Sequence, residues 1–153
     1  MKQPDAQSFE VLDQELEQKL KSRVQTNKLA QTLGFEIVEI RKDFCEITLD
    51  YREEITNGAA SHGTIHGGIV ASLVDVAGAY ALATNFAGQM SFATVDLHIN
   101  FLNRALTKIC ARAYVIRKGR RINVVEADVY DADNKPVAKA ILNFILTKEM
   151  EFK

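Results

Sequence analysis

The sequence is poor in cysteine and carries no excess of charge of either sign. Its two cysteines, Cys45 and Cys110, lie far apart without a neighbouring Cys/His cluster. This spacing argues against a structural zinc site and favours reduced thiols within strands. Nineteen Lys and Arg side chains against twenty Asp and Glu leave a net charge of -1, so no global field draws the chain to nucleic acid. We therefore expect no metal and no nucleic-acid partner.

Long apolar runs are also missing near the start of the chain. The first twenty residues mix acids, amides and lysines, which predicts no secretory signal and a cytoplasmic location. The longest apolar stretch, residues 65–90, contains Asp75 near its middle, and a carboxylate at a bilayer centre costs about 2.5–3.5 kcal/mol. We expect no membrane partner, and 153 residues with 47% hydrophobic side chains fit one compact domain.

Two helices are predicted from the spacing of apolar residues. They recur every three or four positions over residues 7–33, which indicates an amphipathic helix that ends at Gly34. A second helix is expected to begin near His66 and to continue to about Leu82. Because its residues are apolar on almost every side, this helix should be buried on most of its surface.

Alternating apolar and polar residues predict six strands, two before the buried helix and four after it. Their ranges are 35–43, 44–53, 91–102, 108–117, 121–130 and 137–147. A sheet that curls around the helix supplies the cover that an all-apolar helix needs. The order predicts an α+β hotdog fold, an antiparallel sheet wrapped around one long central helix. Residues 1–33 would form an N-terminal helical extension and residues 34–148 the hotdog domain.

Asp75 is isolated from other charges along the chain. Across residues 55–103 the formal charges are Asp75 and Asp96, so no lysine or arginine of this segment can neutralise it. Because burial of an unpaired carboxylate is costly, we expect a partner, a water-filled cleft or a catalytic use. The alternative is an aspartate that caps a break in the helix or faces solvent.

The sequence His66-Gly67-Gly68 marks the expected start of the buried helix. Two glycines leave backbone N–H groups uncovered at the positive end of the helix dipole, where an oxyanion could be held; the alternative is a tight turn. Gly67 and Asp75 are separated by roughly 12 Å along a straight helix, too far for one reaction centre. If both act on one carbonyl, two subunits must share the site, which predicts a homodimer.

Residues 91–102 hold further polar candidates. Strict alternation places Thr94, Asp96, His98 and Asn100 on one face, and Ala93, Val95, Leu97, Ile99 and Phe101 on the other. The polar face could line a catalytic cleft, an oligomer contact or solvent. Thr94 is the strongest candidate for the cleft.

The segments "HGTIHGGIVASLVD", "ATVDLHINFLNRA" and "RKGRR" resemble the hotdog-fold acyl-CoA thioesterases of the phenylacetic-acid-degradation (PaaI) type. The resemblance implies hydrolysis of an acyl-CoA to a free acid and CoA, with no cofactor beyond the CoA of the substrate. It implies that Asp75 is the general base or nucleophile and that the Gly67 N–H polarises the thioester carbonyl. It further implies that His66 orients this loop and that the Thr94 hydroxyl positions water.

One position departs from the family pattern. The family's Asn, six residues before the His of the HGG motif, is replaced by Ala60, and Asn57 and His62 lie nearby but out of register. Either a neighbour substitutes for the missing amide or activity is reduced. The alternative function is therefore a non-catalytic acyl-CoA binding or sensing protein on the same fold. A third hypothesis is a dehydratase or hydratase that uses His98 beside Asp96.

Candidates for substrate binding fall into two groups. The turn "RKGRR" offers cations to the phosphates of CoA, although it could equally be a solvated hairpin tip; its residues are Arg117, Lys118, Arg120 and Arg121. The acyl group is expected beside Gly68, against apolar residues of the helix and strands such as Val70, Ala79, Tyr80 and Phe92. Dimers of this fold often pair further, so we also expect a homotetramer.

Overall fold

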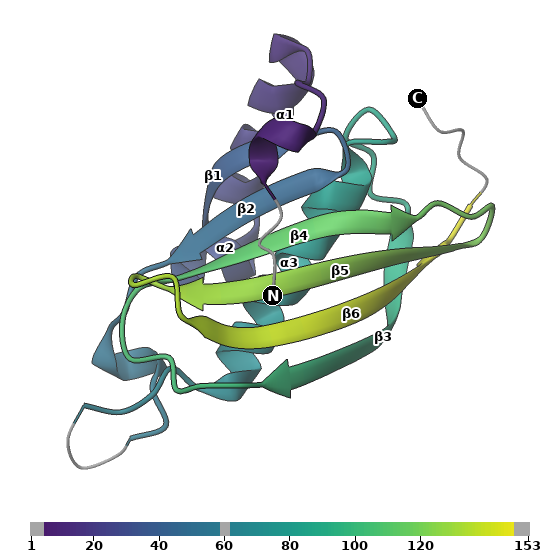
Figure 1. Ribbon diagram of the computed structural model, residues 1–153. Coiled ribbons are helices and arrows are strands. Elements are labelled where there is room, and N and C mark those ends of the chain that lie inside the picture. The colour runs from purple at the N-terminus through teal and green to yellow at the C-terminus, as the bar shows by residue number, and fades with distance from the viewer. Residues whose placement is uncertain (1–4, 59–61, 149–153) are drawn as a thin grey trace.

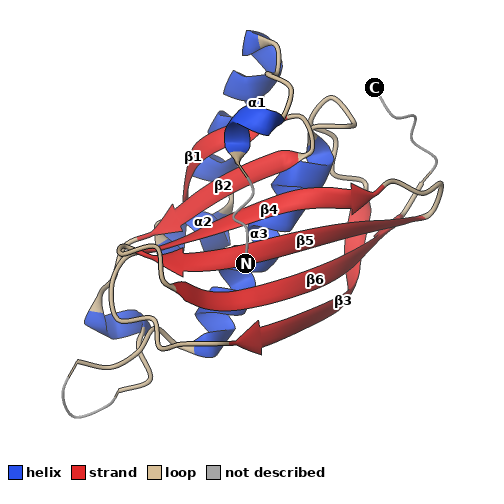
Figure 2. Cartoon of the chain, in the orientation of Figure 1, coloured by secondary structure: helices blue, strands red, loops and turns tan. Residues whose placement is uncertain are grey.

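The computed structural model describes residues 5–58 and 62–148 of the chain. An antiparallel six-stranded sheet with the order β1-β2-β4-β5-β6-β3 curls around the helix α3 (Gly67–Ala83) (Figures 1 and 2). The predicted α+β hotdog fold is thereby confirmed. The division into an extension over 1–33 and a domain over 34–148 stays a prediction.

The strands follow the predicted alternating segments. They are β1 (Glu36–Arg41), β2 (Phe44–Leu49), β3 (Phe92–Phe101), β4 (Ile109–Arg117), β5 (Ile122–Asp131) and β6 (Pro136–Leu146). β1 and β2 form an antiparallel hairpin, and the short η2 turn (Glu53–Ile55) follows β2. β3 lies at one edge of the sheet, beside β6 (Figure 1).

Helix α3 fills the concave side of the sheet and packs against β2, β4 and β5. Val70, Leu73, Val74 and Ala77 are each at most 1% exposed, as the all-apolar sequence predicts. At Gly78 the sheet approaches closely, since a Cβ there would lie 3.4 Å from the Phe144 ring. Burial of apolar side chains between this helix and the sheet is the main stabilising contribution.

The N-terminal segment differs from the single helix predicted over residues 7–33. The structure has η1 (Ala6–Ser8), α1 (Gln14–Thr26) and α2 (Lys28–Leu33). The break occurs at Asn27, whose extended backbone ends α1 and whose side chain accepts from the Ala30 N–H at 3.0 Å, which caps α2. Gly34 ends α2 with φ +77°, as predicted. Leu20 and Val24 of α1 are buried in the same core as α3.

The edge strand β3 contains a β-bulge between Thr94 and Asp96, with Val95 as the extra residue. Thr94 pairs with Phe144, while Asp96 pairs with Asn143. The bulge reverses the alternation, so that Thr94 faces α3 together with Leu97, Ile99 and Phe101. Asp96, His98 and Asn100 face the opposite side of the sheet. The predicted single polar face is therefore wrong.

Candidate active site

The start of α3 leaves one backbone donor unused. His66 is the N-cap residue, and its Nδ1 accepts from the Gly68 N–H at 2.9 Å. The N–H groups of Ile69 and Val70 donate to the His66 carbonyl at 2.9 and 3.1 Å. Among the described residues, the Gly67 N–H has no acceptor. It lies at the positive end of the helix dipole, where an anionic oxygen is favoured.

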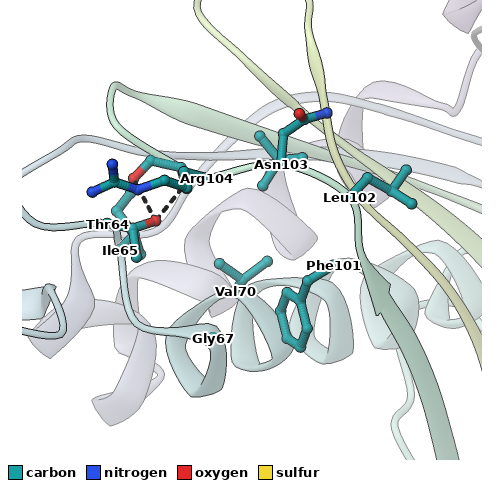
Figure 3. A pocket seen from close by; sticks show the side chains of 10 residues that line it. Thr64, Ile65, Gly67, Val70, Phe101, Leu102, Asn103 and Arg104 are labelled. Atoms are coloured by element: carbon teal, nitrogen blue, oxygen red, sulfur yellow. Dashed lines mark hydrogen bonds between the residues drawn. The ribbon is translucent and has the colours of Figure 1, made fainter.

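A cavity of about 360 Å³ opens beside this donor, between the first turns of α3 and the end of β3. Figure 3 shows the Phe101 ring beside Val70 and Gly67, over the start of the helix. A Cβ on Gly67 would lie 3.1 Å from Phe101 Cζ, so this position favours glycine because the ring is so close. Thr64 borders the cavity, and its hydroxyl accepts from the Ala105 N–H at 2.9 Å.

A second cavity, of about 580 Å³, lies on the other flank of the helix start. His66 and Ile69 line it together with Arg52 and Glu54. The Arg52 guanidinium donates to the Leu33 carbonyl at 2.8 Å, which holds it against the end of α2. Charged side chains therefore stand in the walls of both cavities: Arg52 and Glu54 in this one, and Arg104 in the first, whose other lining residues are mostly apolar.

Asp75 lies two turns further along α3 and faces the start of β3. The Thr94 hydroxyl donates to Asp75 Oδ1 at 2.7 Å. Asp75 is half-buried and forms no ion pair with any described residue, and its Oδ2 accepts no hydrogen bond from them. The partner of this isolated carboxylate is thus a neutral hydroxyl. The bulge at Val95 is the reason that Thr94 can reach it.

Gly67 and Asp75 do not meet within one chain. Gly67 is the first residue of the 17-residue helix α3, and Asp75 lies at its middle. Eight residues of helix span roughly 12 Å. Gly67 lies beside Phe101 at one end of β3, and Asp75 is bonded to Thr94 near the other end. One chain therefore supplies a hydrogen-bond donor and a carboxylate at two separate places.

His62 and Asn57, the polar residues near Ala60, have partners other than the Gly67 N–H. His62 Nε2 lies 2.7 Å from the Leu106 carbonyl, and its ring stacks on Tyr51 with centroids 4.6 Å apart. Asn57 is exposed in the loop after η2, where its N–H donates to the Thr64 carbonyl at 3.0 Å. Ala60 lies outside the described residues.

The four cations of the basic turn are engaged to different degrees. Arg117 donates to the Ile122 carbonyl at 3.1 Å, and Lys118 pairs with Asp43 at 2.8 Å. Arg120 and Arg121 instead border a cavity of about 270 Å³ together with Lys148. Lys118 also donates to Asn85, just beyond the end of α3, so the turn lies at the opposite end of this helix from Gly67.

Of the predicted acyl-binding side chains, Val70 lines the first cavity and Tyr80 and Phe92 line neither cavity. Tyr80 is 2% exposed, and burial raises the pKa of its hydroxyl to about 12 despite the opposing influence of Arg23. Phe92 packs edge-on against Phe144 at 5.6 Å. Phe101 could not be recognised from the sequence as a cavity wall, because an apolar residue in a strand resembles any core residue.

Within residues 5–58 and 62–148, neither a metal-ligand cluster nor a membrane-spanning helix is found. No three His, Cys, Asp or Glu side chains there gather as metal ligands. Nor does any helix there reach the length and apolarity needed to cross a membrane.

The chain is similar to known proteins over most of its length. The profile of the "Thioesterase superfamily" matches residues 62–138. The acyl-coenzyme A thioesterase PaaI of Escherichia coli is 32% identical over 111 residues, which cover 71% of this chain and 75% of that protein. The solved structure of the E. coli PaaI protein has a TM-score of 0.79 at 23% identity and covers 91% of this chain and 98% of its own. A thioesterase family protein from Silicibacter pomeroyi has a TM-score of 0.73 at 26% identity, covering 85% and 96%.

Proposed function

The chain belongs to the thioesterase superfamily, and we propose that it hydrolyses an acyl-CoA thioester to a free acid and CoA. Family membership supports thioester hydrolysis in general. Acyl-CoA as the substrate is supported by the similarity to a protein named as an acyl-coenzyme A thioesterase. The observation that carries the proposal is the Gly67 N–H, which has no acceptor among the described residues and lies beside a largely apolar cavity, on the same chain as Asp75, which forms no ion pair with those residues.

In the proposed reaction, Asp75 takes a proton from water as the water oxygen attacks the thioester carbonyl carbon. The Gly67 N–H donates to the carbonyl oxygen as its negative charge develops, and His66 holds this turn in place through its bond to Gly68. The C–S bond then breaks, and the proton leaves with the CoA thiol. Direct attack by the carboxylate, followed by hydrolysis of the resulting anhydride, uses the same groups. That neither a metal nor a cofactor takes part stays a prediction, as does cytoplasmic location.

We propose that each site is shared by two subunits of a homodimer. β6 occupies one side of β3, and the other side is a free edge along which Val95 and Phe101 are 57% and 54% exposed. Exposed apolar edge strands readily pair with a second chain. Two copies of β3 could therefore join antiparallel, around a twofold axis.

Side-chain direction restricts the register of this pairing, since opposed residues of antiparallel strands lie on one face. One register that meets this condition has its axis at His98 and sets Leu97 opposite the partner subunit's Ile99. Past the bulge, it would set Thr94 opposite the partner subunit's Phe101. Asp75 of one subunit would thus approach Gly67 of the other. Further pairing into a tetramer remains a prediction for light scattering.

The phosphates of CoA are proposed to bind the basic turn, chiefly through Arg120 and Arg121. Arg117 and Lys118 of this turn already bond to the Ile122 carbonyl and to Asp43, whereas Arg120 and Arg121 border an open cavity with Lys148. Charge-assisted bonds from Arg suit phosphate groups. In an antiparallel dimer, the turn of one subunit would lie toward the Gly67 end of the other.

Gly67→Pro tests the donor directly. Proline is favoured at the first helical position and lacks the N–H, and His66 has the ψ of 134° that suits a residue before proline. Gly67→Ala is the matched control, because it adds a Cβ against Phe101 but keeps the N–H. We expect kcat to be about 10²–10³-fold lower in the proline variant than in the alanine variant. Equal rates would contradict the role of this N–H.

Mixing two inactive variants tests the shared site. Refolding Asp75→Asn together with Gly67→Pro should restore about one quarter of wild-type activity, because about half of random dimers are mixed and each has one intact site. If no activity is recovered, Gly67 of one subunit and Asp75 of the other do not form a common site. Saturable acyl-CoA binding by the wild type without CoA release would instead support the non-catalytic binding function.

The dehydratase hypothesis loses its geometric basis. His98 and Asp96 face away from α3 as a consequence of the bulge, whereas Thr94 and Asp75 lie on the helix side. Failure to add water to an enoyl-CoA would be the corresponding kinetic result.

A further inference from the structure

We infer that the cavity beside Gly67 holds the acyl group and that Phe101 selects a short or aromatic acyl group there; this inference rests on the proposed function. The cavity adjoins Gly67, whose N–H is the only one in the first turn of α3 without an acceptor among the described residues. A thioester carbonyl bound to that N–H has its acyl substituent within a few ångströms. The adjoining apolar space is the natural place for it.

The size and lining of the cavity limit what it can hold. Its volume of about 360 Å³ is near the lower end of the range of about 300–1,000 Å³ for ligand cavities. Ile65, Val70, Ala105 and Val137 form its buried walls, each at most 2% exposed. These side chains are fixed by the core, so a long acyl chain cannot enlarge the cavity by displacing them without loss of packing.

Phe101, like its neighbour Leu102, is an exposed part of the wall that can differ between proteins without disturbing the core. It is 54% exposed and ends β3. Its ring is close enough to Gly67 that an added Cβ would lie 3.1 Å from it. An acyl group held by the Gly67 N–H would therefore contact this ring. An aryl acyl group would gain an aromatic pair there, worth on the order of a few-fold to tenfold in selectivity.

The cavity on the other flank of the helix start is less suited to an acyl chain. It borders His66 and Ile69 but not Gly67, and Arg52 and Glu54 stand in its wall. The cavity beside Gly67 also has one charged side chain, Arg104, among its mostly apolar lining residues. Contact with Gly67 therefore assigns the acyl group to the Phe101 side, and Ile69 of the other cavity supplies a matched control residue.

The test measures kcat/KM for straight-chain acyl-CoAs of two to twelve carbons and for benzoyl- and phenylacetyl-CoA. Wild type is compared with Phe101→Ala, Phe101→Leu and Ile69→Ala, after light scattering shows that all have the same oligomeric state. We expect Phe101→Ala to raise the ratio of decanoyl- to phenylacetyl-CoA about tenfold, with Phe101→Leu between it and wild type. Ile69→Ala should leave the ratio unchanged. The inference is overturned if this ratio changes in Ile69→Ala, or if it is the same in the Phe101 variants as in the wild type.

Binding separates this inference from the proposed function. Ketone analogues with a methylene in place of the thioester sulfur are titrated by calorimetry, and their affinities should show the same dependence on Phe101. If the wild type releases no CoA but the analogues show this dependence, the acyl assignment stands and the hydrolase proposal fails. If the wild type releases CoA but the analogue affinities do not depend on Phe101, the acyl assignment fails and the hydrolase proposal stands. Analogue affinities independent of Phe101, or no analogue binding, overturn the assignment even without turnover.

Discussion

Asp75 and Asp128 belong to opposite sides of the same sheet and have different partners. Asp128 of β5 lies on the face opposite α3 with 0% exposure, and Lys139 donates to it at 2.9 Å. Asp75 receives one hydrogen bond from the neutral Thr94 hydroxyl. A carboxylate with a structural role is thus neutralised by a fixed cation, whereas one available for chemistry retains an unengaged oxygen.

The rest of the outer face follows the pattern of Asp128. Glu126 accepts from both Lys139 and Tyr114, and Arg112 of β4 pairs with Glu46 of β2 at 2.8 Å. These are cross-strand pairs between neighbouring strands of the sheet. The outer face thus uses charge to stabilise the sheet, while the helix side keeps a single carboxylate without a cation in the described part of the chain.

The largest expected effect is on the helix side. Asp75→Asn should lower kcat by about 10²–10⁴-fold, because the amide cannot accept the proton of water. The free energy of unfolding in urea should stay within about 0.5 kcal/mol of wild type, since Asp75 has no ion pair to lose. Thiol release from acyl-CoA and urea titration provide the two measurements. Full activity in this variant would remove the distinction between the two aspartates.

Asp128→Asn should produce the converse result. It removes the charge that pairs with Lys139 inside the sheet, and we expect the free energy of unfolding to fall by about 1–3 kcal/mol. kcat/KM should be unchanged. Asp133→Asn, at an exposed position in the turn between β5 and β6, is the matched control and should cost less than about 0.5 kcal/mol. Equal costs for both substitutions would show that the Lys139 pair contributes nothing.

A smaller effect is expected from the hydroxyl that orients Asp75. Thr94→Val keeps the shape of the side chain but deletes the donor, and should lower kcat about tenfold, equivalent to one hydrogen bond. Thr94→Ser restores the hydroxyl and should return kcat to near the wild-type value. Steady-state kinetics of the three proteins provide the test. A serine variant as slow as the valine variant would mean that the methyl group, not the hydroxyl, matters.

The smallest effect concerns pH and the outer face. Burial alone would raise the pKa of Glu126, but hydrogen bonds from Lys139 and Tyr114 outweigh it and leave this pKa lowered. Ionised Glu126 therefore stabilises the fold above its unfolded pKa of about 4.3. This contribution is lost as pH falls through the lower folded pKa. Glu126→Gln should flatten the decline of unfolding free energy below pH about 4.3 by under about 1 kcal/mol, measured by urea titration at several pH values.

Periodicity predicted the architecture because it reports which face of each element is buried. The largely apolar pattern of residues 66–82 could belong only to a covered helix, and the alternation of the strands matched their pairing except at bulges such as the one in β3. The His66-Gly67 start was also predictable, since glycine and a side-chain acceptor are local signals of a helix N-terminus. The break at Asn27 has such a signal too, a capping residue, but the apolar spacing across it masked the interruption.

The bulge at Val95 could not be predicted by counting alternate residues. Valine is a common strand residue, so nothing local indicates that it is extra in the ladder. The single inserted position decided which polar side chains face α3, and it separated Thr94 from His98. The roles of Arg117 and Lys118 were equally hidden, because their partners, the Ile122 carbonyl and Asp43, are fixed by tertiary structure.

The separation of Gly67 and Asp75 along α3 has a consequence for how much of this protein must be present before it acts. If each subunit carries two half-sites, an isolated chain has no complete one. Below the dissociation constant of the dimer, the concentration of complete sites would rise with the square of the chain concentration. Specific activity would then fall on dilution, so that abundance itself sets the threshold at which thioester begins to be consumed.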